Sequence, residues 1–248
     1  MLRIIPKSDV RVIPYKDCLA KTILLEAGSK PGVSVKTHCL IVGYVAKELL
    51  SRLPVWLREN LFPKGSELIA AAHDVGKISP AFQEKIHRDI GKNLGLVNPE
   101  LDKVIGYHSS VSQAAVSSCS KYIPEVLGRH HGESPSSVES PDAGIYGGSG
   151  WQKERMDLLN VLKEGLNVDW PLVSSALHAD VLSGLTTVAD WIGSGSLFDE
   201  VNQDSWKNCI SEALDRAGFV APKIRRGLSF KEVFGFSPHD IQTTLQKS

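Results

Sequence analysis

Residues 66–77 read SELIAAAHDVGK, an apolar run that ends in a histidine next to an aspartate. The apolar spacing predicts a helix that begins near Ser66 and ends near Gly76. Adjacent residues of an α-helix diverge by about 100°, so His73 and Asp74 can face one cleft only from a helix end or an irregular turn. The glycine provides such an end. The segment therefore predicts a helix that delivers an imidazole and a carboxylate to one site.

Further imidazoles and one more carboxylate occur on other predicted helices on both sides of this segment: His38, His108, His130, His131 and Asp190. Imidazole nitrogens and carboxylate oxygens are the ligands that Fe, Mn, Co, Ni and Zn prefer. An isolated histidine on an apolar helix face is usually a core residue with one hydrogen bond, and we assign a structural role to His87, His178 and His239. Together with His73 and Asp74, the chain has seven imidazole or carboxylate residues of this kind in four helical elements. So many are harder to explain as core residues. They predict a shared metal site.

The composition narrows the class of protein. The chain has 248 residues, of which 42% are hydrophobic and 23% charged, enough for one substantial core or two small domains. Lys+Arg and Asp+Glu number 28 each, which argues against binding of nucleic acid by bulk charge alone. No apolar run approaches the roughly 20 residues of a membrane-spanning helix, and the N-terminus lacks a secretory signal. Four scattered cysteines are typical of reduced thiols in a cytoplasmic protein.

The hydrophobic periodicity predicts one mainly α domain, with at most a small β element near the N-terminus. The β-prone pieces are Leu2–Ile5 and Val10–Pro14, whereas Gly28–Gly32 predicts a loop. Gly132–Gly150 is rich in Gly, Ser and Pro, and it predicts a long surface loop that contributes nothing to the core. Besides the helix quoted above, helices are predicted over the ranges 38–53, 109–122, 151–166, 171–192 and 205–218, with a short one from residue 124.

The motifs resemble those of a known superfamily. His38, the pair within AAAHDVGK and Asp190 within VADW are similar to the H…HD…D pattern of the HD phosphohydrolases. GYHSS and GRHHG resemble its two-metal branch. Within that branch, ISPAFQEK after HDVGK and the segment LSGLTTVADWIGS resemble the HD nuclease domain of type I CRISPR helicase-nucleases. The resemblance spans His38 to Ser196 and implies an HD-domain helical bundle that hydrolyses phosphodiesters with bound metal ions.

The resemblance also implies the ligands of two divalent ions. One ion is expected on four residues: His38, His73, Asp74 and Asp190. Asp74 is expected to bridge to a second ion, which is held by three further residues: His108, His130 and His131. The implied ions are transition metals, Mn, Fe, Ni or Co, with Mg and Zn as alternatives. Two such ions can clamp a phosphodiester for in-line attack by water.

Asp74 and Lys77 are the predicted catalytic residues. Lys77 matches the lysine of the family's HDxGK motif, and it can add positive charge at the scissile phosphate. The alternative is a lysine that only complements the C-terminal end of a helix. Ser194 and Trp191, beside Asp190, are expected to support the helix end rather than to contact substrate.

The implied function is a single-stranded DNA nuclease of type I CRISPR interference. Its implied partners are the RNA-guided surveillance complex (Cascade), which exposes the strand, and a helicase in cis or in trans, with no membrane. No G-x-x-x-x-G-K-[ST] motif occurs, so the chain holds no NTPase motor. We expect a nuclease domain over 1–235 and a linker over 236–248 that resembles the start of a helicase domain. The chain is then either a fragment cut at that boundary or a separately encoded subunit.

Two other functions stay open. An HD phosphodiesterase acting on a cyclic or small nucleotide shares the HD and HH pairs, but its Gly-Tyr-Pro signature after the paired histidines is missing, because HHG continues into ESPSSVESP. A scaffold with purely structural metals is the second alternative, since structural sites are closed and catalytic sites keep open positions. Metal-dependent turnover of a DNA oligonucleotide distinguishes an enzyme from a scaffold, and a cyclic dinucleotide assayed in parallel distinguishes the two enzymes.

Overall fold

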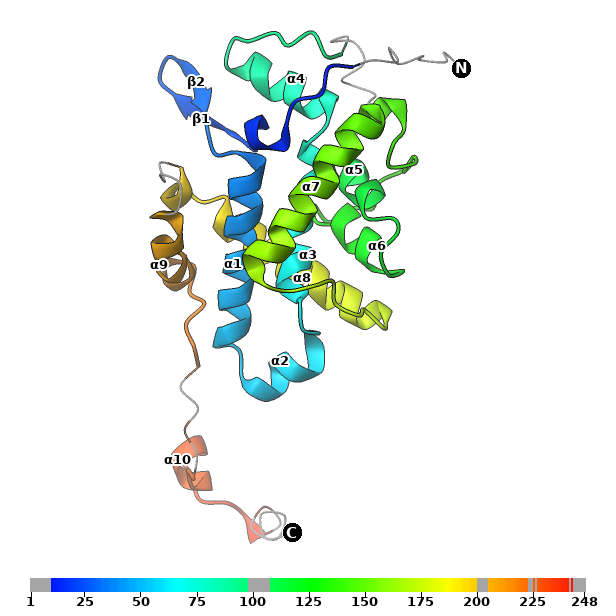
Figure 1. Cartoon of the computed structure of the whole chain (residues 1–248). Coiled ribbons are helices and arrows are strands. Elements are labelled where there is room, and N and C mark those ends of the chain that lie inside the picture. Colours follow the sequence, from blue (N-terminus) through cyan, green and yellow to red (C-terminus); the bar gives the residue numbers. More distant parts are fainter. Residues whose placement is uncertain are drawn as a thin grey trace.

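The computed structural model describes residues 10–97, 108–199, 205–222, 225, 227–240 and 242. Helices dominate this part of the chain, as the sequence predicts (Figure 1). The helices are α1 (Val35–Arg52), α2 (Val55–Leu61), α3 (Ser66–Ala72), α4 (Pro80–Asp89), α5 (His108–Ala115), α6 (Ile123–Gly128), α7 (Gly148–Leu166), α8 (Ala176–Gly193), α9 (Ile210–Arg216) and α10 (Phe230–Phe234). None of the helices in the described ranges is long and apolar enough to cross a membrane.

The short helix α3 lies at the centre of the bundle. Every residue from Leu68 to Ala72 is fully buried, and the helix packs against α1, α6, α7 and α8. Three of these residues are alanines, which allows the neighbouring helices to approach closely. One close approach is to Gly43 of α1, where an added Cβ would lie 2.8 Å from Ala71 Cβ. The C-terminal end of α3, which leads into His73, is therefore fixed inside the protein.

The small β element is a hairpin, but the sequence prediction misplaced it. Strands β1 (Thr22–Leu25) and β2 (Gly28–Pro31) pair antiparallel, with Leu25 opposite Gly28. The segment predicted as a loop is thus mostly strand, and the β-prone Val10–Pro14 forms no strand. Glu26-Ala27 connects the strands without the Asn-Gly or Asp-Gly signal of a tight hairpin, and Gly28 takes up the left-handed φ of 121° that the turn requires. The other β-prone piece, 2–5, lies outside the described residues.

The prediction of a surface loop over Gly132–Gly150 is wrong in one respect. Most of it is irregular, but Tyr146 is 2% exposed and packs with Val111 and Ala114 in a small cluster of its own. Helix α7 begins inside the range, at Gly148. A single buried tyrosine therefore anchors a segment whose composition is otherwise that of a solvated loop.

Because α1 packs closely on α3, adding one methyl group at Gly43 should destabilise the protein. Gly43→Ala places a Cβ 2.8 Å from Ala71 Cβ and 3.0 Å from Leu166 Cδ1. Overpacking of this kind costs about 1–3 kcal/mol, which exceeds the roughly 1 kcal/mol that alanine gains over glycine in a helix. We expect a lower free energy of unfolding in urea.

Gly184→Ala in α8 is the matched control, because nothing lies within 4 Å of the added Cβ. It should raise the free energy of unfolding by about 0.5–1 kcal/mol. Equal shifts for the two variants would contradict the close contact between α1 and α3.

Candidate metal centre

The fold brings all seven predicted ligands together from five segments. They come from α1 (His38), the turn after α3 (His73, Asp74), the first residue of α5 (His108), the segment after α6 (His130, His131) and the last turns of α8 (Asp190). Their ligand atoms form two groups, and the atoms of each group lie within 4.8 Å of one another. The first group is His38, His73, Asp74 and Asp190, and the second is His108, His130 and His131. These are the two sets that the resemblance implies, although ion binding by them stays a prediction.

The chain geometry after α3 explains how adjacent side chains face one site. The helix ends at Ala72, four residues before the predicted end at Gly76, and Val75–Lys77 forms a 3-10 turn. Gly76 has a different role, which is close approach. A Cβ there would lie 2.0 Å from His108 O, and the Gly76 amide donates to Ser112 Oγ at 2.9 Å. The glycine therefore allows the first turn of α5 to pack directly on the turn that carries Asp74.

The two oxygens of Asp74 face different groups. Asp74 Oδ2 lies 3.0 Å from His38 Nε2 and 3.2 Å from His73 Nε2. Asp74 Oδ1 lies 3.1 Å from His108 Nε2 and 3.5 Å from His130 Nε2. One buried carboxylate thus stands between the two groups, which is the arrangement that a bridging ligand requires.

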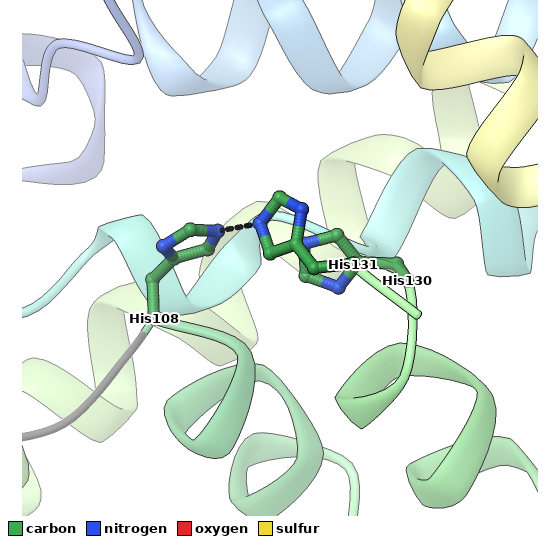
Figure 2. A group of neighbouring side chains, drawn as sticks. All are labelled: His108, His130 and His131. Atoms are coloured by element: carbon green, nitrogen blue, oxygen red, sulfur yellow. Dashed lines mark hydrogen bonds between the residues drawn. The ribbon is translucent and has the colours of Figure 1, made fainter. Parts of the chain in front are cut away.

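The second group is more open than the first, and Figure 2 shows its three side chains. His108 projects from the start of α5 toward the histidine pair, and its Nε2 lies 2.9 Å from His131 Nε2. The rings of His130 and His131 are 4.0 Å apart between centroids. His130 is buried whereas His131 is exposed, so solvent reaches the centre from this side.

Backbone carbonyls orient two of the rings. His73 Nδ1 lies 2.7 Å from Ala70 O, and His130 Nδ1 lies 2.6 Å from Leu127 O. Because a carbonyl can only accept a hydrogen bond, Nδ1 is the donor in each ring. A neutral ring then presents the lone pair of Nε2 to the centre, as a metal-binding histidine must.

The electrostatics of the first group favour a bound cation. Burial alone lowers the pKa of His73, but the carboxylates of Asp74 and Asp190 outweigh it and raise the pKa to about 10. Burial raises the pKa of Asp190, yet the neighbouring His73 and His38 hold it well below its usual range. The carboxylates are therefore ionised at neutral pH and attract positive charge, which either a proton or a divalent ion can supply.

The second group has the opposite tendency. Partial desolvation of the ring, together with the neighbouring rings of His130 and His108, lowers the pKa of His131 to about 4. The pKa of His108 is also lowered, mainly by burial. A neutral imidazole is the form that binds metal. At neutral pH, His108 and His131 can therefore bind an ion without first losing a proton.

The residues present fit a metal centre. Eight buried side-chain nitrogen or oxygen atoms among the described residues make no hydrogen bond of acceptable geometry, in spite of the short ion-pair contacts above, and five of them belong to the seven predicted ligands. These five are His38 Nδ1, His38 Nε2, His73 Nε2, Asp74 Oδ1 and His130 Nε2. A buried polar atom without a partner costs about 1–3 kcal/mol, so such a concentration indicates a missing partner. The donor set, imidazole and carboxylate without thiolate, suits divalent transition metals.

Lys77 also reaches the centre. Its Nζ lies 2.6 Å from Asp74 Oδ2 and 5.4 Å from the centroid of the Phe82 ring. Burial lowers the pKa of Lys77, but the Asp74 carboxylate outweighs this effect and raises it. The Phe82 ring in turn packs edge-on against His108, with centroids 5.4 Å apart. Sequence reasoning missed Phe82, although ISPAFQEK was among the motifs that carried the resemblance.

Two hydroxyls support the end of α8 near Asp190. Ser194 Oγ donates to Asp190 Oδ1 at 3.0 Å, in agreement with its expected role. Thr187 Oγ1 donates to His130 O at 3.1 Å and ties α8 to the second group. Trp191 was expected to support the helix end, but it is 73% exposed and packs little.

Two of the remaining histidines bond locally. His87 Nδ1 lies 2.8 Å from Gln83 O, and His178 Nδ1 lies 3.3 Å from Ser174 Oγ. Neither belongs to a group of metal-ligating side chains among the described residues, and nor does His239.

Comparisons with known proteins agree with the motifs. The family described as "Cas3, HD domain" matches residues 20–198. A CRISPR-associated nuclease/helicase Cas3 from Streptococcus thermophilus is 24% identical over 240 residues, which covers 77% of this chain and 25% of the relative. The chain therefore spans about a quarter of that relative's length.

Solved structures share the fold. Cas3 of T. fusca with ADP superposes with a TM-score of 0.73 at 22% identity, over 93% of this chain and 30% of that one. The Cas3 HD domain of Thermus thermophilus, crystallised in the presence of Ni²⁺, gives a TM-score of 0.54 at 20% identity, over 75% of this chain and 85% of that one. These likenesses confirm the mainly α HD-domain fold. The family match spans most of the chain and confirms the predicted family of hydrolytic nucleases. The chain belongs to the Cas3 HD domain family.

Proposed function

We propose that this chain is a metal-dependent nuclease domain that cleaves single-stranded DNA in type I CRISPR interference. The observation that carries the proposal is the buried Asp74 carboxylate, whose two oxygens face two groups of imidazoles. That arrangement suits two ions held side by side, and paired ions are a recurring device of phosphodiester hydrolysis.

Two sets of residues would hold the ions. The first set is His38, His73, Asp74 and Asp190, and the second is Asp74, His108, His130 and His131. Mn, Fe, Ni or Co are the proposed ions, with Mg and Zn as alternatives. The nickel present with the Thermus thermophilus domain supports a transition metal. When bound, such ions supply Lewis-acid charge to the phosphodiester and activate water for the attack.

The exposure of the ligands favours a catalytic centre over a structural one. His38, His73 and His130 are buried, but His131 is exposed and the side chain of Asp190 is 15% exposed. A structural site is closed by its protein ligands. Here one side is left for a substrate phosphate, and the Lys77 ammonium adjoins Asp74 and adds positive charge there.

The substrate and partners follow from charge and from the relatives. A chain with no net charge attracts a polyanion weakly, so we expect weak, sequence-independent binding of DNA by this domain alone. A helicase, in cis or in trans, would feed in the single strand that the surveillance complex exposes. The nuclease/helicase relative supports this assignment. The proposed location is the cytoplasm, and a domain boundary near residue 235 stays a prediction.

Metal removal tests the proposal. We expect the metal-stripped protein to leave labelled single-stranded and double-stranded DNA intact, because the charge that stabilises the transition state is absent. Resupply of Mn, Ni, Co, Fe or Mg one at a time should restore degradation of the single strand alone, as followed on denaturing gels. Turnover of a cyclic dinucleotide in place of DNA would favour the small-nucleotide alternative. Tight metal binding without turnover of either substrate would favour a structural scaffold.

Asp74→Ala should abolish cleavage while the protein stays folded, since it removes the ligand that both groups share. The expected loss is at least about 10³-fold in kcat, measured beside circular dichroism. Asp180→Asn is the control, because that aspartate is exposed on α8 and pairs with Arg129 outside the centre. Near-wild-type cleavage by Asp74→Ala would show that the bridging assignment is wrong.

Gly76→Ala should separate the two groups. The new Cβ would meet His108 O at 2.0 Å, so α5 must move away from the turn that carries Asp74. Calorimetric titration with Ni²⁺ should show that the weaker of two binding events is lost or weakened at least about tenfold, whereas Gly184→Ala changes neither. Unchanged titration of a folded Gly76→Ala variant would mean that His108 does not ligate together with Asp74.

A further inference from the structure

The turn that carries Lys77 is held by three buried side chains from three different helices. One backbone group of each of three consecutive residues is bound: the Gly76 amide donates to Ser112 Oγ of α5 at 2.9 Å, Lys77 O accepts from Gln83 Nε2 of α4 at 2.9 Å, and Ile78 O accepts from Arg155 Nη1 of α7 at 2.8 Å. We call these three side chains the turn clamp. Each of them is fully buried, so their polar groups are desolvated and depend on these bonds.

Arg155 shows how strongly the turn is constrained. Its guanidinium also donates to Tyr146 O at 3.0 Å and to Pro141 O at 2.7 Å, and to the side chain of Gln152. No carboxylate is among these acceptors, and burial lowers the pKa of Arg155 to about 10. The buried guanidinium therefore donates only to backbone carbonyls and to one neutral side chain. These bonds fix Ile78 to the anchored segment around Tyr146.

Gln83 is the member of the clamp that binds Lys77 itself. Its Nε2 donates to Lys77 O and, at 3.0 Å, to Leu19 O, while its Oε1 accepts from the Leu19 amide at 3.0 Å. Both amide hydrogens and the carbonyl are therefore used. Leu19 offers one donor and one acceptor, so only one orientation of the carboxamide satisfies it. The backbone of Lys77 is thereby tied to the segment just before β1.

We propose that Gln83 is a positioning residue for Lys77, and this inference rests on the proposed nuclease function. The lysine side chain has a flexible four-carbon stem, yet its Nζ lies 2.6 Å from Asp74 Oδ2. Holding the backbone from which that stem starts reduces the freedom that must be lost when the ammonium meets a substrate phosphate. A misplacement of about 1 Å can lower a rate by about 10²-fold.

A double-mutant cycle on cleavage of a single-stranded oligonucleotide tests the proposal in the whole chain. Gln83→Met keeps the length of the side chain and removes its hydrogen bonds. We expect Lys77→Met to lower kcat about 10²-fold and Gln83→Met to lower it about tenfold, with KM changed less than about twofold. In the Lys77→Met background, Gln83→Met should lower kcat less than about twofold further, because its effect acts through the absent ammonium.

Glu84→Gln is the matched control. Glu84 lies on the same helix and is 1% exposed, but it accepts from the amides of Leu94 and Leu96 and from Arg88 Nε rather than from the turn. We expect it to lower the melting temperature, as Gln83→Met does, and to leave kcat within about twofold. Hydrogen exchange should accelerate at residues 76–78 in Gln83→Met and at residues 94–96 in Glu84→Gln.

Three results would overturn the proposal. Independent, multiplicative losses of kcat in the double variant would mean that Gln83 acts apart from Lys77. Loss of Ni²⁺ binding by Gln83→Met would mean that it acts on the metal ligands. Unchanged hydrogen exchange at residues 76–78 in Gln83→Met would mean that Gln83 does not hold the turn. This measurement does not depend on nuclease activity. A wild-type chain that cleaves no DNA with any metal would instead refute the proposed function.

Discussion

The carboxylate of Asp74 is 2% exposed and lies among imidazoles on both sides, so it carries its charge inside the protein. A buried carboxylate is tolerated only where positive charge and hydrogen-bond donors surround it. Burial raises the pKa of Asp74, but His73, Lys77 and His108 outweigh it and hold the pKa well below its usual range. The helices that supply these partners, and the turns that aim them, are arranged around this one requirement.

Close packing at two glycines makes that arrangement attainable. At Gly43 it brings α1 against α3, so that His38 reaches His73, and at Gly76 it brings the first turn of α5 against the turn after α3. Neither contact leaves room for a Cβ. The two groups of ligands are therefore joined through glycines that carry no chemistry themselves, and the site depends on the absence of side chains as much as on their presence.

The clustering of the seven candidate ligands and the helical fold could be predicted because each carries a local signal: an imidazole or carboxylate on an apolar face, or an apolar period of 3.6 residues. The hairpin over residues 22–31 could not, because its turn lacks the usual residues and Gly28 alone marks it. The role of Gly76 was predicted as a helix end, whereas α3 had already ended at Ala72 and the glycine serves a contact 32 residues away in sequence, with His108. Tyr146 and the clamp residue Arg155 were missed for the same reason: a long-range contact leaves no periodicity in the sequence.

The asymmetry of the centre connects these contacts to chemistry. The first group is the more enclosed one, the Ala70 carbonyl orients the ring of His73, and the carboxylates of Asp74 and Asp190 raise the pKa of His73. The second group reaches solvent through His131, whose lowered pKa keeps it neutral. A cation would therefore be held firmly on one side of Asp74 and would remain accessible on the other. A ligand of such a cation would approach from the side of His131, whereas the buried helices behind His73 hold Asp74 in place.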